Sequence, residues 1–234
     1  MKIACCILSY NITKGMKSFG PIGLLKKSNN TNNKELIIHQ IEYLRKIFGS
    51  VDMYVMTGFG KDRMDKKITE KRSVNIVHNA EFNHKNYSYA FKLFLQTIQP
   101  KLDNYHGVFF LDANVLIKSL NNKKRNHSWI VTKPHKNHTQ DNEDFLGVNI
   151  NNGDTVEYLF YNIGNLDWCK SFYLTQNDMR TIIDNVHLYH DNMFLFEILN
   201  QSIEYLGIKF HINKGSDSKQ IIEIKGIKDK HKVK

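Results

Sequence analysis

Residues 35–60, ELIIHQIEYLRKIFGSVDMYVMTGFG, carry the clearest information about how the chain folds. Apolar residues recur at helical spacing in the first half of this stretch, and Gly49 follows them as a helix stop. The short apolar run VDMYVMT comes next and is followed by two glycines, which is typical of a buried strand. The stretch therefore predicts a helix that ends at Gly49 and a buried strand that begins at residue 51.

Further strands and helices alternate on both sides of this stretch. The patterns predict strands over 2–10 (KIACCILSY), 73–79 (SVNIVHN) and 107–117 (GVFFLDANVLI), and a helix over 86–98. Buried strands that alternate with helices are typical of parallel βαβ units, so we expect a doubly wound α/β domain with a mostly parallel central sheet. Ligands bind such sheets beyond the carboxyl ends of the strands, which places the expected site after Leu8, Thr57 and Leu111.

The second half of the chain has a less regular pattern. Residues 121–152 are polar and contain one strand candidate, WIVTKPH at 129–135. Beyond them, the patterns predict a strand over 156–163, helices over 166–185 and 192–207, and strands over 208–213 and 220–226. No linker rich in proline, glycine or serine divides the chain, which favours a single domain over residues 1–234.

The charge balance restricts the classes of partner. Lysine and arginine exceed aspartate and glutamate by ten, which suits nucleotides, nucleic acid or an acidic protein partner. The excess is spread through segments rich in Asn, Lys and Ile, as the AT-rich genome of a phage or its host would produce. The basic residues do not interleave with aromatic ones, so nucleic acid is not an expected partner. No apolar run approaches the roughly 20 residues that span a bilayer, so a membrane is not expected either.

The three cysteines, Cys5, Cys6 and Cys169, cannot all pair, and the first two are adjacent. This favours buried structural thiols in a reducing compartment, which predicts a cytoplasmic protein, or one in the host cytoplasm or the virion if the source is viral. Cys169 has no identified general base and is not expected to act as a nucleophile.

Five stretches resemble, in order, the sugar-phosphate nucleotidylyltransferases of the nucleotide-diphospho-sugar transferase superfamily. They are 7–27 (ILSYNITKGMKSFGPIGLLKK), 35–60, 79–98 (NAEFNHKNYSYAFKLFLQTI), 107–117 and 221–230 (IIEIKGIKDK). The resemblance implies a Rossmann-like fold with a nucleotide-binding half over 1–120 and a substrate and metal half over 121–234. It also implies nucleotidyl transfer from a nucleoside triphosphate to a sugar phosphate, with Mg²⁺ as cofactor.

The resemblance indicates which residues would form the site. The candidate substrate-binding residues are Ser9, Asn11, Lys14, Asn86, Ser88, Asp112 and Lys225. Asn86 and Ser88 could equally cap a helix. Asp112 and Asn114 share one face of a strand and are the candidate metal ligands. The catalytic residue is not identified, and Lys14 and Lys26 are the candidates for a catalytic cation.

The chain also departs from the family pattern at four places. The phosphate loop contains bulky residues such as Ile12 in place of glycines, and Ile22 stands at the catalytic lysine. Asn114 and Lys225 stand at the two metal aspartates, and Lys225 carries the wrong sign to hold a cation. A Mg²⁺ cofactor is therefore doubtful. Lys225 is instead predicted to lie near Asp112 or Asn114, as a built-in cation for an anionic ligand or as an ion-pair partner of Asp112, and the alternative is an exposed surface lysine.

Three functions remain open at this point. The first is a divergent nucleotidyltransferase-like protein that binds a nucleotide or nucleotide sugar, with transfer weak or lost. The second is a non-catalytic structural or binding module, for example of a phage particle, that keeps only the fold and binds a protein partner. The third is an active nucleotidylyltransferase or glycosyltransferase with a shifted metal site at Asp112 and Asn114.

Other polar and aromatic groups are given structural roles. A solvated loop, rather than a metal cluster, is expected for His135, His138, Asp141, Glu143 and Asp144. Asp191 is predicted to be the N-cap or first-turn acid of the helix after it. Core or interface positions are expected for Phe194, Phe196 and Tyr205.

Overall fold

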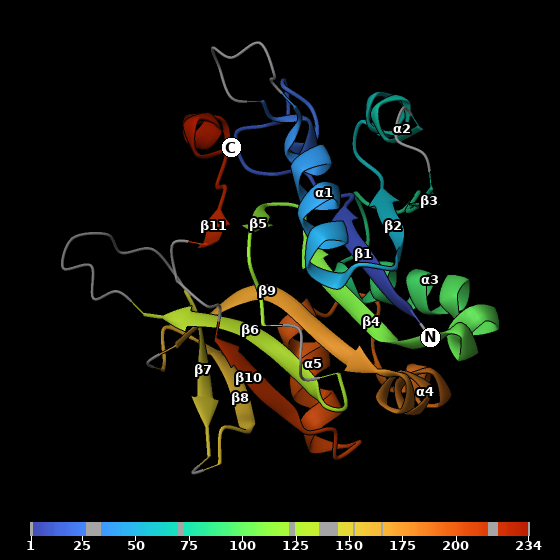
Figure 1. Cartoon of the computed structure of the whole chain (residues 1–234), viewed down its shortest axis with the longest axis vertical. Helices are drawn as coiled ribbons and strands as arrows, with labels where there is room; N and C mark the ends of the chain where they lie inside the picture. The colour runs from blue at the N-terminus through green and yellow to red at the C-terminus, as the bar shows by residue number, and fades with distance from the viewer. Residues whose placement is uncertain are drawn as a thin grey trace.

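The computed structural model describes residues 2–26, 34–69, 73–121, 125–135, 145–151, 153–164, 166–214 and 220–233. Within these residues a nine-stranded sheet runs through the molecule (Figure 1). Its strands are β1 (Lys2–Ser9), β2 (Val51–Thr57), β3 (Val74–His78), β4 (Tyr105–Asp112), β6 (Ser128–Pro134), β7 (Leu146–Ile150), β8 (Val156–Tyr161), β9 (Leu166–Thr175) and β10 (Phe210–Lys214). The main path has the order β10-β6-β9-β4-β1-β2-β3, and β7 and β8 extend it beside β9.

The half of the sheet formed by β1 to β4 is parallel. Strand β1 pairs in parallel with both β2 and β4, and β3 pairs in parallel with β2. The intervening helices are α1 (Leu36–Phe48), α2 (Lys61–Thr69) and α3 (Tyr87–Ile98). The predicted α/β fold with a mostly parallel central sheet is confirmed. Strand β9 is the exception within the main path, since it runs antiparallel to both β4 and β6.

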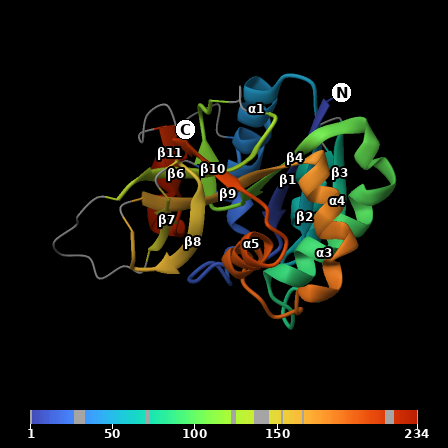
Figure 2. The same cartoon turned by 90° about the horizontal axis from the view of Figure 1, so that it is seen from below.

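Helices cover both faces of this sheet. Side chains of a strand alternate between the two faces, so Cys5 and Cys6 of β1 enter different buried clusters. Cys5 lies with α1 and α2, whereas Cys6 lies with α3, α4 (Gln176–Asp184) and α5 (Leu195–Glu204). Figure 2 shows α3, α4 and α5 on one side of the sheet and α1 on the other. Both thiols are fully buried, and burial raises the pKa of each.

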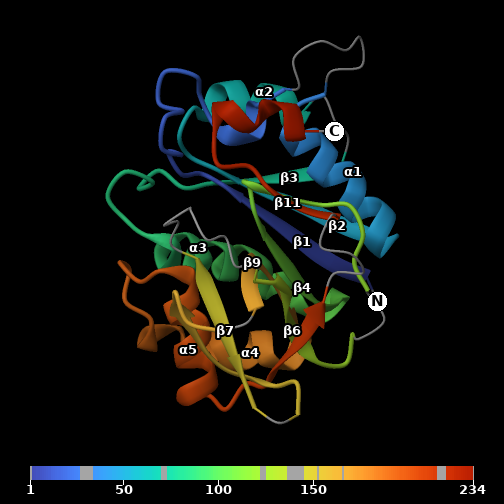
Figure 3. The same ribbon diagram turned by 90° about the vertical axis from the view of Figure 1, so that its left-hand side faces the viewer.

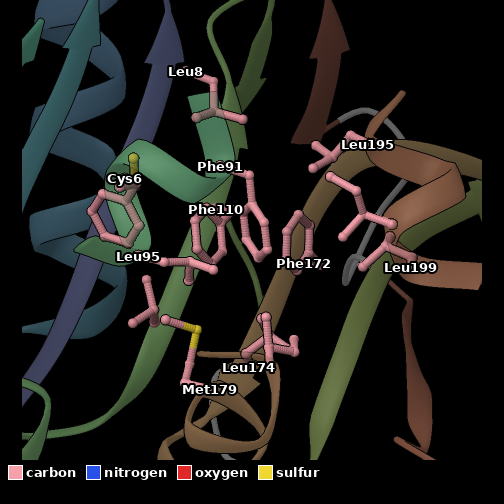
Figure 4. Close-up of a cluster of buried hydrophobic side chains, with 14 of the residues drawn as sticks. Cys6, Leu8, Phe91, Leu95, Phe110, Phe172, Leu174, Met179, Leu195 and Leu199 are labelled. Carbon is pink, nitrogen blue, oxygen red and sulfur yellow. The ribbon is translucent and has the colours of Figure 1, made fainter. Parts of the chain in front are cut away.

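Aromatic rings join the parallel half of the sheet to β9. Phe110 of β4 and Phe172 of β9 stack with ring centroids 4.6 Å apart, and Phe91 of α3 packs against Phe110 at 5.3 Å (Figure 4). Such pairs contribute roughly 0.5–1.5 kcal/mol beyond the burial of their area. The cluster therefore fixes β9, and every side chain that β9 carries, relative to the end of β4.

The helix predicted over residues 166–185 is wrong in its first ten residues. These residues form β9, and α4 begins at Gln176 after the N-cap Thr175, whose side chain accepts a 3.2 Å hydrogen bond from the backbone N–H of Asp178. Strand β9 is largely buried on both faces, so its apolar residues do not alternate with polar ones. An apolar run of this kind does not distinguish a strand from a buried helix.

Three further differences concern two elements that were not predicted and one predicted strand that is divided. Helix α2 and strand β7 were not predicted, because their sequences lack a clear apolar period. The strand predicted over 107–117 is interrupted by a turn at Ala113 and Asn114, after which β5 (Val115–Ile117) leaves the large sheet. Strand β5 pairs antiparallel with β11 (Ile221–Glu223), and Glu223 stands opposite Val115. This pairing brings the last residues of the chain to the carboxyl end of β4.

The end of the described chain lies at the same end of the molecule as α2 (Figures 1 and 3). It forms the short helix η5 (Ile227–Lys232) after β11. Among the described residues, no helix has the length and apolar content needed to cross a bilayer.

Candidate functional site

Polar side chains mark the carboxyl ends of the four parallel strands. Ser9 and Thr57 end β1 and β2 and stand opposite each other in the register, while Asn79 and Asn114 follow β3 and β4. In each of the four, one buried polar atom has no hydrogen-bond partner: Ser9 Oγ, Thr57 Oγ1, Asn79 Nδ2 and Asn114 Oδ1. An unsatisfied buried polar group costs about 1–3 kcal/mol. We call these four residues the carboxyl-edge row, and its unpaired atoms suit a polar ligand.

Asp112 is the last residue of β4 and lies beside this row. Its Oδ2 accepts a 2.9 Å hydrogen bond from the hydroxyl of Tyr87, and its Oδ1 accepts one of 3.0 Å from the backbone N–H of Asn114. Burial raises the pKa of Asp112, and the nearby ammonium of Lys170 is the main opposing influence. Both carboxylate oxygens are therefore already in use within the protein.

Lys170 brings a positive charge to the same place. Its Nζ lies 2.6 Å from Oε1 of Glu223, which belongs to β11. Burial lowers the pKa of Lys170, but the charges of Glu223 and Asp112 outweigh it, and the pKa is raised overall. The ammonium is therefore charged at neutral pH. About two fifths of the Lys170 side chain remains exposed (40%), so a ligand can reach it.

Two tyrosines close the other side of Asp112. Tyr10 follows β1, and its ring meets that of Tyr87 edge to face at 5.7 Å. Burial, with a further contribution from Asp112, raises the pKa of both phenols, and the buried hydroxyl of Tyr10 has no hydrogen-bond partner. Gly58 permits this arrangement, since a Cβ there would lie 2.9 Å from the carbonyl oxygen of Tyr10.

Helix α1 fixes the turn after β4 through the side chain of Gln40. The side chain of Gln40 is buried and donates to the carbonyls of Ala113 at 3.0 Å and Val115 at 2.7 Å. A buried side-chain amide with several backbone acceptors fixes the conformation of the turn. Gln40 thus positions Asp112 and Asn114 at the edge of the sheet.

The structure brings several predicted site residues together and gives others internal partners. Ser9, Asn11, Asp112 and Asn114 gather at the carboxyl edge, as their positions after strands predicted. Lys14 is exposed, and its carbonyl oxygen lies 3.6 Å from where a Cβ of Gly226 would be. Figure 1 shows the same proximity, with the loop after β1 next to the chain end.

Lys26 forms an ion pair of 3.1 Å with Glu35, at the start of α1. Ile22, at the position of the family's catalytic lysine, is buried in the short helix η1 (Ile22–Leu24). The cation candidates of this loop are therefore either exposed, like Lys14, or paired, like Lys26.

Asn86 and Ser88 connect α3 to residues 190–193. Asn86 occupies the N-cap position of α3 without a side-chain capping bond, and its Nδ2 donates to the carbonyl of Asn192 at 2.9 Å. The hydroxyl of Ser88 donates to the carbonyl of His190 and accepts from the backbone N–H of Met193. These contacts place the start of α3, including Tyr87, over Asp112.

The role predicted for Asp191 is wrong. The N-cap of α5 is Phe194 and its first-turn acid is Glu197, while Asp191 forms ion pairs with Lys85 at 3.1 Å and Lys92 at 2.9 Å. The attraction of Lys85, which precedes α3, and of Lys92 on α3 decides the placement of Asp191, and the helix begins later. Phe194 and Tyr205 are exposed, which excludes the core position for both.

Of the predicted solvated loop, His138, Asp141, Glu143 and Asp144 lie outside the described residues. His135 lies within them, and its Nδ1 is 2.7 Å from Oδ1 of Asp167.

The backbone of Lys225 lies next to the turn after β4. The backbone N–H of its neighbour Ile224 donates to the carbonyl of Asn114 at 2.7 Å, and its own backbone N–H donates to Asp229. A cation whose charge acts on Asp112 is Lys170, and the role of the Lys225 side chain stays a prediction. Sequence patterns did not identify Lys170, Glu223 or Tyr87 as site residues. The available signal was the presence of single charged residues within apolar runs, CKSFYL and IIEI.

The residues at this edge do not fit a divalent cation. No group of three His, Cys, Asp or Glu side chains that could hold a metal ion occurs in the described part of the chain. Asp112 already accepts two hydrogen bonds, and Glu223 already faces an ammonium. Mg²⁺ is usually held by one or two carboxylates together with waters and substrate phosphates, and here the carboxylates of Asp112 and Glu223 already have partners within the protein.

Solved structures similar to the whole chain were found. CTP:phosphocholine cytidylyltransferase from Streptococcus pneumoniae has a TM-score of 0.76 and 16% identity, over 99% of this chain and 97% of that one. An inositol-1-phosphate CTP transferase from T. maritima has a TM-score of 0.68 and 15% identity, over 97% and 90%. UDP-glucose pyrophosphorylase complexed with UDP-glucose has a TM-score of 0.64 and 9% identity, over 100% and 97%. No protein-family model matches the sequence, and neither does the sequence of any curated protein.

Proposed function

We propose, from the nucleotide-diphospho-sugar transferase fold of this chain, that it binds a nucleotide or nucleotide sugar at the carboxyl edge of the sheet and that its nucleotidyl transfer is weak or lost. The observation that carries the proposal is the carboxyl-edge row, in which four adjacent strands each present a buried polar atom without a partner. A nucleotide offers phosphate, ribose and base groups over a comparable length. Its binding would satisfy atoms that now lower the stability of the protein.

Weak transfer follows from the electrostatics of the loop. Phosphoryl and nucleotidyl transfer depend on cations that neutralise charge as it develops on the phosphates. The buried Ile22 supplies none, and Lys26 is paired with Glu35. The bulky Ile12 also stands where glycines would let phosphate approach the backbone.

Calorimetric titration with CTP, UTP and UDP-glucose tests the binding. We expect saturable binding of at least one of them. The double variant Ser9→Ala/Thr57→Val should weaken it about tenfold, because each lost hydrogen bond is worth about 0.5–1.5 kcal/mol. Thr132→Val is the matched control, since its Oγ1 is likewise buried and unpaired but lies on β6, away from the row. Equal affinities for all three proteins, or no binding by the wild type, would refute the proposal.

An assay of pyrophosphate release separates the remaining functions. The acceptors to test are phosphocholine, inositol 1-phosphate and glucose 1-phosphate, which match the chemistry named for the similar structures. Turnover near the usual 1–1000 per second would favour an active transferase and remove the weak-transfer proposal. Nucleotide binding without turnover supports the proposal. Absence of both favours a non-catalytic module, such as a component of a phage particle, that keeps the fold alone.

A further inference from the structure

We infer that Lys170 takes the place of a divalent cation in this site, so that Asp112 and Glu223 are balanced by a built-in ammonium and the ligand binds without Mg²⁺. The part of this inference that concerns the ligand rests on the proposed function. The part that concerns the metal does not, because it can be measured on the protein alone.

An irregularity in the backbone of β9 determines the direction of the Lys170 side chain. Residues Ile130 and Thr132 of β6 are two apart, but their partners on β9, Phe172 and Trp168, are four apart. The extra residues of β9 form a bulge that includes Lys170, and a bulge redirects the side chains it carries. Lys170 has φ +46°, in the left-handed region. For a residue with a long side chain this conformation costs about 1–2 kcal/mol, so the surrounding contacts must hold it there.

The contacts that hold Lys170 are those of a counter-ion between two carboxylates. Its Nζ is 2.6 Å from Glu223, and its charge and that of Asp112 attract each other across the site. Glu223 stands opposite Val115, and the backbone N–H of its neighbour Ile224 donates to the carbonyl of Asn114 at 2.7 Å, which brings Glu223 to the end of β4 where Asp112 lies. Two neighbouring carboxylates at a sheet edge are an arrangement that otherwise attracts a divalent cation. In this protein the ammonium of Lys170, which is part of the chain, takes the place of that cation.

The charge balance is consistent with an anionic ligand. The ammonium of Lys170 contacts Glu223 at 2.6 Å, and about two fifths of the Lys170 side chain (40%) is exposed, so an anionic ligand can also reach it. Lys14 and Lys225 belong to the two backbone segments that border the site.

Mn²⁺ binding, followed by electron paramagnetic resonance on the protein without nucleotide, tests the metal part. We expect the wild type to bind Mn²⁺ weakly and Lys170→Gln to bind it at least tenfold more tightly, because the two carboxylates lose their counter-ion. The gain should disappear in Lys170→Gln/Glu223→Gln and should be absent in Lys170→Arg, which keeps the charge. Lys101→Gln, an exposed lysine at the opposite end of β4, is the control and should match the wild type.

Equal Mn²⁺ affinity in the wild type and Lys170→Gln would overturn the inference, and so would tight wild-type binding that Glu223→Gln abolishes. Circular dichroism of each variant verifies that it is folded, and Lys170→Arg keeps the test decisive if Lys170→Gln does not fold. In that case, tight Mn²⁺ binding by Lys170→Arg overturns the inference, and wild-type-like weak binding supports it.

The ligand part is tested by titrating UDP-glucose and CTP into the wild type in EDTA and in Mg²⁺. We expect UDP-glucose to bind with equal affinity in both and Lys170→Gln to bind it at least tenfold more weakly in EDTA. Binding that requires Mg²⁺ would overturn the inference while leaving the proposed function intact. Absence of binding under both conditions would refute the proposed function, whereas the Mn²⁺ result would stand.

Discussion

The hydroxyl of Tyr87 donates a 2.9 Å hydrogen bond to Oδ2 of Asp112 and so joins the first turn of α3 to the carboxyl end of β4. The two elements are separated in the chain by residues 99–104, and the contacts of Asn86 and Ser88 with residues 190–193 hold the start of α3 in place. The bond favours the ionised form of Asp112, whereas burial, the largest influence on its pKa, opposes ionisation.

Removing this donor should destabilise the protein and raise the pKa of Asp112 further. In Tyr87→Phe the carboxylate keeps its burial but loses one of its two hydrogen bonds, which costs about 1–3 kcal/mol when the group is ionised. We expect urea denaturation at pH 7 to show this loss, and a smaller loss at pH 4, where Asp112 is closer to neutral. Tyr89→Phe, on the same helix, is the control. An identical loss at both pH values would contradict the role given to Asp112.

Asp112→Asn should be more stable than the wild type at neutral pH. Because the folded-state pKa of Asp112 is raised by burial, the stability contributed by this group is complete below its unfolded pKa of about 3.9 and is lost as the pH rises through the folded value. The substitution removes that loss, and we expect a gain of about 0.5–2 kcal/mol in the free energy of unfolding at pH 7. The gain should vanish toward pH 4. A less stable variant at pH 7 would show that the ionised carboxylate is favourable.

Gly58→Ala should disrupt the loop over the site. The new Cβ would lie 2.9 Å from the Tyr10 carbonyl oxygen and 2.9 Å from Cβ of Phe82, and neither can move without shifting backbone. Overpacking of this kind costs roughly 1–3 kcal/mol. Gly153→Ala provides the comparison, because its Cβ would meet its nearest neighbour at 3.5 Å. Thermal unfolding of both variants measures the difference, and equal midpoints would be evidence against the described loop.

Asp191→Asn should weaken the attachment of residues 190–193 to α3. Hydrogen bonds from Lys92 and Lys85 lower the pKa of Asp191, so its contribution to stability is present above the unfolded pKa and is lost as the pH falls through the folded one. These ion pairs are partly exposed, and we expect a loss of only about 0.2–1 kcal/mol at pH 7. Urea denaturation at pH 7 and pH 2.5 gives the comparison. A loss that persists at pH 2.5 would exclude an ionic origin.

Local patterns predicted the parallel half of the molecule because its strands and helices are short, well separated and alternate regularly along the chain. The stretch from Leu36 to Thr57 is a helix and a strand, as its spacing of apolar residues indicates. Strand β9 was missed for a physical reason. Its side chains enter the buried clusters on both faces of the sheet, and that burial, which depends on distant residues, removes the alternation by which a strand is recognised.

The sequence by itself determined which polar residues follow the buried strands, and so placed Ser9, Asp112 and Asn114 at one edge of a parallel sheet. That inference needs only the direction of the strands, which the chain order implies. The tertiary structure alone decided which charge meets Asp112. Lys170 and Glu223 are 53 residues apart and each lies within an apolar run. They meet because β9 bulges at Lys170 and because β11 pairs with β5, and both depend on contacts between segments far apart in the chain.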